Sequence, residues 1–195
     1  MNTYTELLNA VTSYAGQDGN LEFTDMVPLF ISLGEADVYR NLRHDRMIKN
    51  IAINSVIPPY LIPDDCLEMV AVLQGYSQCE FVTSDFILSK PATATDPTVW
   101  SILGNELIFD GTPTSNTAIS YFSKPVELAQ AANPMFVQNP DLFLYAALSH
   151  AMIFLRDEVR QGIWDGLFRQ KLQEIMGAAW SARLPKQQLL VMRTV

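Results

Sequence analysis

Hydrophobic residues change their spacing twice along the chain. In residues 3–43 and 139–183 they recur every three or four positions, which is the spacing of one face of a helix. In residues 46–124 short apolar or alternating runs are separated by Gly, Pro, Asn and Asp, which is typical of strands joined by turns. The pattern therefore predicts two helices, a β-rich block and two further helices.

The first helix has recognisable start and stop signals. Thr3 and Glu6 form a capping box, in which the Thr hydroxyl accepts a backbone N–H and the Glu side chain reaches back. Gly16 is expected to end the helix. The apolar face between these signals holds Leu7, Leu8, Val11, Tyr14 and Ala15.

A second helix is predicted to start at Thr24-Asp25 and to continue through Arg43. Pro28 would then lie in the first turn, where its missing amide has no helical partner to lose. Gly34 falls on the apolar face of this helix, where glycine costs about 1 kcal/mol relative to alanine. We therefore expect another helix to cross closely at this position.

The middle of the chain is predicted to form strands and one short helix. Gly75-Tyr76-Ser77 is expected to turn one strand back on the next, and Gly104-Asn105 is a hairpin signal. A short helix is expected from Thr83 to Lys90. The expected strands are Met47–Ile57, Leu67–Leu73, Cys79–Val82, Val99–Leu103, Glu106–Phe109 and Thr117–Phe122.

Two helices follow near the C-terminal end. Asn139-Pro140-Asp141 opens an apolar helix that runs to about Leu155, with the proline at the first helical position. Asp157-Glu158 starts a final helix, since acidic residues favour a helix N-terminus, and Leu184-Pro185 ends it. The expected core face of the final helix is Trp164, Phe168, Lys171 or Leu172, Ile175 and Ala179.

These elements predict an α+β fold in which the outer helices pack together as a four-helix frame and an antiparallel β-rich subdomain is inserted between them. We expect a single domain of residues 1–183, with helices in 3–43 and 139–183 and the insertion at about 46–124. Residues 184–195 are expected to form an extended C-terminal arm.

Composition and charge narrow the classes of protein. Of 195 residues, 49% are hydrophobic, which excludes wholesale disorder. The net charge of −8 argues against a general nucleic-acid binder, because such proteins need a basic face for phosphates. Residues 50–150 hold two basic and ten acidic residues, whereas residues 156–195 hold seven basic and four acidic residues. An acidic body with a basic tail suggests that the tail docks on an acidic partner, although a solvated terminus would look the same.

Targeting and membrane signals are not expected. The first residues have neither the basic region nor the apolar core of a secretory signal. The longest strongly apolar stretch, Leu142 to Leu155, is shorter than the ~20 residues that a membrane span needs, so a buried helix is the better interpretation.

Candidate catalytic residues are few. Cys66 and Cys79 are interpreted as reduced, packed cysteines, because they form no CxxC pair and have no nearby His for a zinc site. A hydrogen-bonded core role is favoured over catalysis for His150, and a polar helix end for His44. The carboxylate pairs are Glu35/Asp37, Asp64/Asp65 and Asp157/Glu158. Asp64-Asp65 is interpreted as a turn and Asp157-Glu158 as a helix start, while close neighbours on a helix, such as Glu35 and Asp37, point to different faces. The sequence therefore predicts no catalytic residue, cofactor or metal.

The order of several short motifs resembles the head-to-tail adaptor proteins of tailed bacteriophages, also called neck or connector proteins. The resemblance covers about residues 4–180 and excludes the tail of the chain. The matching segments are Tyr4-Thr5-Glu6-Leu7-Leu8, Phe23-Thr24-Asp25 to Tyr39-Arg40-Asn41-Leu42-Arg43, Ile62-Pro63-Asp64-Asp65-Cys66-Leu67-Glu68, Leu107-Ile108-Phe109 with Thr112-Pro113, Ile119-Ser120-Tyr121-Phe122 with Lys124-Pro125, Asn139-Pro140-Asp141-Leu142-Phe143-Leu144-Tyr145-Ala146-Ala147-Leu148, and Phe154-Leu155-Arg156-Asp157 with Trp164.

The resemblance implies a structural virion protein and not an enzyme. Its copies would form a ring, in this family usually dodecameric, beneath the portal protein, where they extend the DNA channel and join the tail or nozzle protein. DNA would pass without specific binding, no membrane would be involved, and the protein would be in the host cytoplasm during assembly and then in the virion neck. The portal-docking arm would comprise Leu184, Pro185, Lys186, Leu189, Leu190, Val191, Met192, Arg193 and Val195.

Two alternatives remain open. The chain could be another virion ring component, such as a tail terminator or tail tube protein. It could also be a neck protein that cleaves peptidoglycan, although the sequence offers acidic residues without an identifiable cleft.

Overall fold

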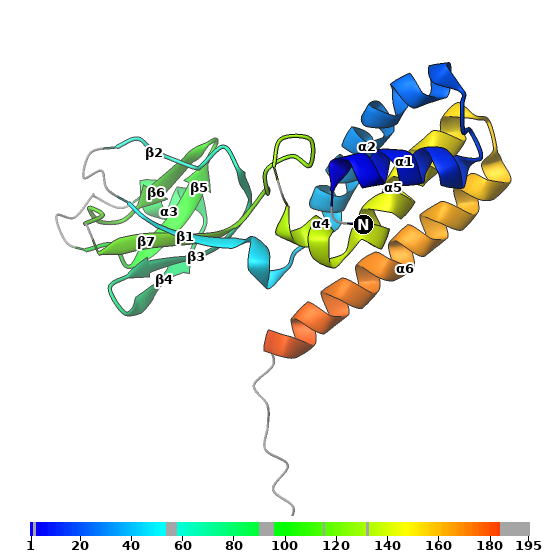
Figure 1. Ribbon diagram of the computed structural model, residues 1–195. Helices are drawn as coiled ribbons and strands as arrows, with labels where there is room; N and C mark the ends of the chain where they lie inside the picture. The colour runs from blue at the N-terminus through cyan, green and yellow to red at the C-terminus, as the bar shows by residue number, and fades with distance from the viewer. Residues whose placement is uncertain (2, 54–57, 90–95, 115, 132, 184–195) are drawn as a thin grey trace, which may run out of the picture. The chain divides into compact units, whose positions relative to one another are not determined.

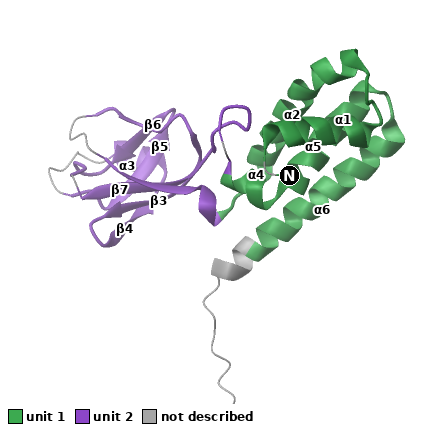
Figure 2. Cartoon of the chain, viewed as in Figure 1, with its two compact units in different colours: residues 1–44, 134–195 green, residues 45–133 purple. Residues whose placement is uncertain are grey.

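The computed structural model describes residues 1, 3–53, 58–89, 96–114, 116–131 and 133–183, with side chains as far as residue 178. The chain divides into two compact units, coloured separately in Figure 2. Residues 1–44 and 134–195 form the helical unit, and residues 45–133 form the β unit. The β unit is thus inserted between helices, which confirms the predicted α+β class. That the two units act as one domain remains a prediction.

The described residues of the helical unit are mostly helical (Figure 1). The unit was expected to contain four helices, and among the described residues it contains one more, a short helix that ends just before Asn139. Its Met135 and Phe136 are buried, and the Phe136 ring meets Phe143 edge to face at 5.6 Å between centroids. Five residues are too few to show helical periodicity in a sequence. The helices are α1 (Tyr4–Ala15), α2 (Leu21–Asn41), α4 (Pro134–Gln138), α5 (Pro140–Phe154) and α6 (Glu158–Arg183).

Helix α5 is the centre of the helical unit. Helices α1, α2, α4 and α6 all pack against it, and side chains on every side of it are fully buried. This explains why α5 is mostly apolar, and it confirms a buried helix for most of the stretch from Leu142 to Leu155. The last turn is the exception, because Ile153 and Phe154 are exposed and the helix ends at Phe154. The fully buried residues of α5 include Leu142, Ala147, Leu148, Ala151 and Met152.

Aromatic side chains join α1 and α6 to α5. The Trp164 ring of α6 stacks on Tyr145 of α5 at 5.8 Å and meets the edge of Tyr14 of α1 at 6.1 Å between centroids. Phe168 and Ile175 are buried on the same side of α6. The predicted core face of the final helix is therefore confirmed up to Ile175, while the side chain of Ala179 lies outside the described residues.

The ends of α1 are those that the sequence predicts. The Thr3 hydroxyl accepts a hydrogen bond from the backbone N–H of Glu6 at 3.2 Å. Gly16 ends the helix with a φ of 70°, a left-handed conformation that favours glycine, and donates its N–H to Ser13. Both signals are local hydrogen-bond motifs, which is why the sequence alone was sufficient.

The start of α2 was predicted too late. The helix begins at Leu21, because the side chain of Asn20 caps it by accepting the backbone N–H of Phe23 at 3.2 Å. The prediction that Pro28 lies in the first turn was therefore wrong, since Pro28 lies inside the helix. Because proline has no backbone N–H, the carbonyl of Thr24, four residues earlier, receives no hydrogen bond from position 28. Pro28 is exposed, so water can reach that carbonyl instead.

Gly34 marks the crossing of α2 and α5, as predicted. A Cβ atom added at Gly34 would lie 2.7 Å from the backbone N of Ala147 and 2.9 Å from the carbonyl carbon of Ala146. The two backbones therefore approach more closely than any side chain at this position would allow. This contact sets the spacing between α2 and α5.

The β unit contains a single sheet of seven strands among the described residues, in the order β1-β7-β3-β4-β5-β6-β2 (Figure 1). A one-turn helix, η1 (Asp45–Met47), precedes the sheet, and α3 (Ser84–Leu88) follows β4. Both predicted hairpin turns are confirmed, with Gly75 and Gly104 at φ 59° and 63°. The strands are β1 (Ile48–Ala52), β2 (Tyr60–Leu61), β3 (Cys66–Gln74), β4 (Ser77–Phe81), β5 (Val99–Leu103), β6 (Glu106–Phe109) and β7 (Thr117–Ser123).

The sheet is antiparallel except for one pairing. Strands β4 and β5 pair in parallel, with Glu80 opposite Val99 and Phe81 opposite Trp100. A parallel pair needs a crossover connection, and the segment that contains α3 provides it. The sequence predicts α3 but not its consequence for strand direction. The core of the unit comprises Val72, Cys79, Trp100, Leu107, Ile119 and Tyr121.

Candidate functional site

The predicted portal-docking arm follows α6 directly. Helix α6 ends at Arg183, and residues 184–195 lie outside the described residues. The structure therefore gives no geometry for Leu184 to Val195, and their role stays a prediction. What it does show is that the buried residues of the helical unit lie upstream, with Ile175 the last of them among the described side chains.

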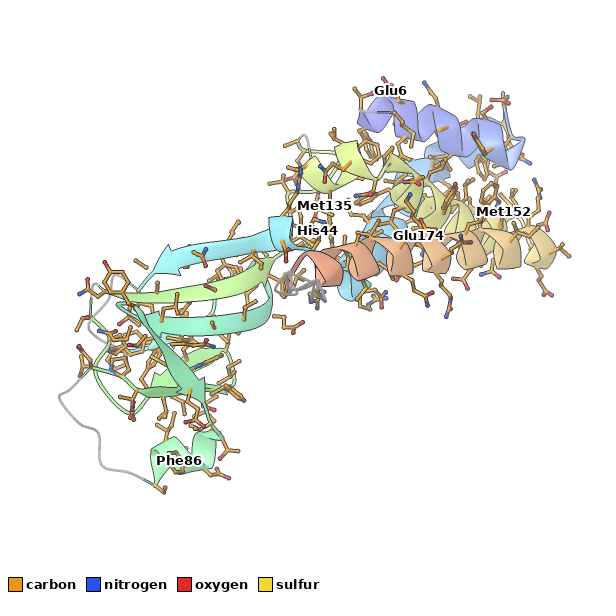
Figure 3. All side chains as sticks on the ribbon, turned by 90° about the horizontal axis from the view of Figure 1, so that it is seen from below. Glu6, His44, Phe86, Met135, Met152 and Glu174 are labelled. Atoms are coloured by element: carbon orange, nitrogen blue, oxygen red, sulfur yellow. The ribbon has the colours of Figure 1, made fainter. Side chains whose placement is uncertain are left out.

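His150 holds α5 to α2 through a carboxylate. Its Nε2 lies 2.8 Å from Oδ2 of Asp37, and Arg40 donates to Oδ1 of the same carboxylate at 2.6 Å. The interpretation of His150 as a hydrogen-bonded histidine is confirmed, although its side chain is half-buried and does not lie in the core. His44 follows the end of α2 by three residues, as expected of a polar helix end (Figure 3).

Asp37 also lines a groove between α2 and α6 with a volume of about 360 Å³. Across the groove, Arg169 donates to Asp165 at 2.9 Å. No serine, cysteine or histidine is among the described residues that line it. The groove therefore offers ion pairs and amides but no nucleophile. Its lining residues are Asp37, Asn41, Asp165, Phe168, Arg169, Leu172 and Gln173.

The other carboxylate pairs have structural surroundings. Glu35 is buried in α2 while Asp37, two residues on, faces His150, so the two do not share a site. Asp157 caps α6, since its Oδ1 accepts the backbone N–H of Arg160 at 2.9 Å. Hydrogen bonds from the backbone and side chain of Arg160 lower the pKa of Asp157 below its usual value. The interpretation of Asp157-Glu158 as a helix start is confirmed.

Asp65 connects three segments of the β unit. One carboxylate oxygen accepts the hydroxyl of Tyr121 at 3.0 Å, and the other pairs with the ammonium group of Lys49. Burial by itself would raise the pKa of Asp65, but the hydrogen bonds from Lys49 and Tyr121 outweigh it, so that the pKa lies below its usual value. Burial and the bond to Asp65 raise the pKa of Tyr121 to about 12. The predicted turn at Asp64-Asp65 thus also anchors β7.

Replacing Asp65 should destabilise the β unit in a pH-dependent way. Asp65→Ala leaves the Tyr121 hydroxyl without its acceptor, which should cost about 1–3 kcal/mol near neutral pH. Because the pKa of Asp65 is lowered on folding, its contribution is present above the unfolded pKa and is lost as pH falls through the folded pKa. Urea unfolding near neutral pH and at about pH 3 should therefore show a difference between wild type and variant that shrinks in acid. A difference that does not change with pH would contradict the assignment.

Both cysteines are free thiols. Cys79 is buried in the core of the β unit, with its sulfur 3.3 Å from the carbonyl oxygen of Pro97, and Cys66 is half-buried. Burial raises the pKa of both thiols, which keeps them protonated and unreactive. This matches the interpretation of both as packed cysteines.

Neither a metal cluster nor a membrane helix is found in the part of the chain that the structure describes. Within those residues, no three His, Cys, Asp or Glu side chains come together in a way that could hold a metal ion. No helix among them combines the length and the hydrophobicity needed to cross a membrane.

The helical unit presents two uncharged helix faces to solvent. The first, which we term the α6 face, includes Val159 and Ile163, whose exposed fractions are 77% and 56%. The second, the α2 face, includes Leu29 and Leu33, with exposed fractions of 48% and 43%. The α6 face comprises Val159, Gly162, Ile163, Gly166 and Gln170, and the α2 face comprises Pro28, Leu29, Ser32, Leu33 and Ala36.

Sequence reasoning assigned no role to either face. The spacing of Val159, Ile163 and Gly166 on a helix was available, but apolar residues at that spacing are equally typical of a core. The β unit also exposes apolar side chains around β4 and α3, namely Phe81, Phe86 and Leu88. Of these, Phe86 is labelled in Figure 3. Exposed apolar residues grouped in this way suit contacts with other proteins better than they suit catalysis.

Comparison with protein families relates the chain to bacteriophage adaptor proteins. The sequence profile of the SU10 adaptor protein family matches residues 2–188, which span both units. No curated protein matches the chain in sequence.

Proposed function

Since this chain belongs to the SU10 adaptor protein family, a family of structural bacteriophage proteins, we propose that its copies form a ring beneath the portal, extend the DNA channel and join the tail. The observation that carries this proposal is the family match to residues 2–188, which includes residues of both units. The protein would act by docking and geometry in the neck of the virion, after assembly in the host cytoplasm.

The charge of the chain supports a conduit for DNA. Residues 45–133, the β unit, hold ten acidic and four basic residues. A channel surface with this excess of negative charge repels phosphates, so that DNA slides past without being held. The contacts within the chain support a structural role. His150, Asp65 and Asp157, which could otherwise act as catalytic groups, are each hydrogen-bonded to a residue that helps to hold the fold together.

The partners would be the portal protein on one side and a tail or nozzle protein on the other. We propose residues 184–195 as the portal contact, with the basic residues Lys186 and Arg193 beside the apolar run Leu189 to Met192. An extended segment of this composition could add a strand to a portal subunit. A dodecameric ring is the copy number that the family resemblance suggests.

The proposal is tested by negative-stain electron microscopy of the full chain mixed with portal rings from the same phage. The expected result is a second ring stacked on one end of each portal ring. Bare portal rings beside free protein would contradict the proposal. In that case, finding the protein only in capsid-free tails would favour a tail terminator or tail tube protein, and clearing in a peptidoglycan zymogram would favour a cell-wall-cleaving neck protein.

A further inference from the structure

The α6 face and the α2 face are built like halves of an interface. Each has apolar or small residues at spacings of three and four positions, so that they lie along one side of a helix. Neither includes a charged residue, although charged residues occur on both helices. Helix α6 runs along the surface of the helical unit, as Figure 3 shows. Exposed helix faces in proteins normally carry charges, so two uncharged ones in one unit need a reason.

Glycines on the α6 face show how closely a partner could approach. A Cβ atom added at Gly162 or Gly166 would meet nothing within 4 Å, so no contact with the described residues explains either glycine. Gly34 in the same unit is the informative comparison, because there the missing Cβ allows the backbone of α5 to come close. Glycine weakens a helix, and at Gly34 a helix–helix contact offsets that loss. A second helix packed over Gly162 and Gly166 would offset it there.

The charges of the two helices favour each other as partners. Helix α2 holds four acidic residues and one basic residue, and α6 holds three acidic and four basic residues. Because Glu35 is buried and Asp37 pairs with His150, the exposed acidic side chains of α2 are Glu22 and Asp25. In an antiparallel crossing of the two faces, Glu22 and Asp25 at the start of α2 would lie towards Arg169, and Arg40 would lie towards Glu158. Arg40 and Arg169 each pair with a carboxylate on their own helix, but their side chains are 71% and 73% exposed, so that both can also contact a neighbour.

We propose that the α6 face of one copy packs against the α2 face of the next copy. This inference rests on the proposed function, because a ring of identical copies needs contacts between two different patches of the same chain. The α2 face and the α6 face are such patches, since they lie on two helices that both pack on α5. Leu29 and Leu33 of one copy then cover Val159, Ile163 and the two glycines of its neighbour.

A large side chain in place of Gly166 should impair assembly of the copies without impairing the folding of each copy. Gly166→Leu replaces a glycine in open space with a good helix former, so the urea unfolding midpoint should stay the same or rise. The bulky side chain would hold the neighbouring helix away, and ring formation on portal rings should need a protein concentration roughly tenfold higher or more. Asn9→Leu, at an exposed position of α1 outside both faces, is the matched control and should assemble like wild type.

A cross-linking experiment identifies the two surfaces directly. Full-length Leu33→Cys and Ile163→Cys variants are oxidised separately and as a mixture, with and without portal rings. We expect covalent dimers in the mixture and few in either variant alone, since the two faces differ. Wild type, whose Cys79 is buried and whose Cys66 is half-buried, measures the background.

The outcomes distinguish this inference from the proposed function. Stacked rings without mixed dimers would overturn the inference and leave the adaptor function standing. Abundant dimers of Ile163→Cys alone would also overturn it, because they show two α6 faces paired about a two-fold axis. Mixed dimers in protein that never stacks on portals would support the contact between copies while contradicting the proposed position beneath the portal.

Discussion

Deleting residues 184–195 should abolish binding to the portal while both units stay folded. The described core of the helical unit is complete by Ile175, and the β unit lies entirely upstream, so the deletion removes no described core residue. The deleted segment contains Leu189, Leu190, Val191 and Met192 in succession. Each such side chain contributes about 1.5–3 kcal/mol when fully buried. Even after the cost of ordering the segment, affinity should fall by roughly a hundredfold or more.

The measurement is co-sedimentation of full-length and truncated chains with portal rings, with circular dichroism to compare their folding. Two double variants refine it. In an added strand, alternate side chains point to opposite faces, so Leu189→Asp with Val191→Asp and Leu190→Asp with Met192→Asp should differ in effect. Unchanged binding of the truncated chain would contradict the assignment of the arm, and equal losses from both double variants would contradict the strand geometry.

Gly34→Ala should destabilise the helical unit more than any other single methyl group added to its surface helices. The new Cβ would lie 2.7 Å from the Ala147 backbone N and 2.9 Å from the Ala146 carbonyl carbon, and neither backbone atom can rotate away. Overpacking of this kind costs about 1–3 kcal/mol or more. The better helix propensity of alanine returns less than about 1 kcal/mol. We expect a net loss of about 2 kcal/mol, and a larger loss for Gly34→Val.

Gly177→Ala is the matched control for this prediction. It makes the same chemical change in α6, where the added Cβ would meet nothing within 4 Å, and should stabilise the helix by about 0.5–1 kcal/mol. Urea unfolding followed by helical circular dichroism compares the two variants. If both variants stabilised the protein, helix propensity and not the close crossing would determine the effect at Gly34.

These predictions depend differently on the sequence and on the structure. Gly34 was identified from the sequence, because a glycine on the apolar face of a helix weakens that helix unless a close crossing offsets the loss, but the partner backbone was not. The portal arm stays a prediction, which rests on the family resemblance and on the basic, apolar composition of residues 184–195. The α2 and α6 faces needed the structure, since periodicity reports that residues share a face but not whether that face is covered.

Errors in the sequence analysis have specific causes. The start of α2 was misplaced because Thr24-Asp25 and Asn20 are both plausible caps, and the hydrogen bond from Phe23 to Asn20 decided between them. Helix α4 was missed because it is short. The parallel pairing of β4 with β5 was missed because strand direction depends on where the chain returns after α3, and no local signal records that.

The sequence by itself determined the type and order of the main elements, the hairpin turns and the family, because helical period, strand alternation, caps and ordered motifs are all local properties of the chain. Only the tertiary structure decided which distant residues meet. His150 and Asp37 pair across 113 positions, and Tyr121 and Asp65 across 56. Such pairs form only when helices or strands pack at a particular angle and distance. That angle and distance depend on many residues at once, so no short segment of the sequence reveals them. The same packing decided which two helix faces of the helical unit stay open to a partner.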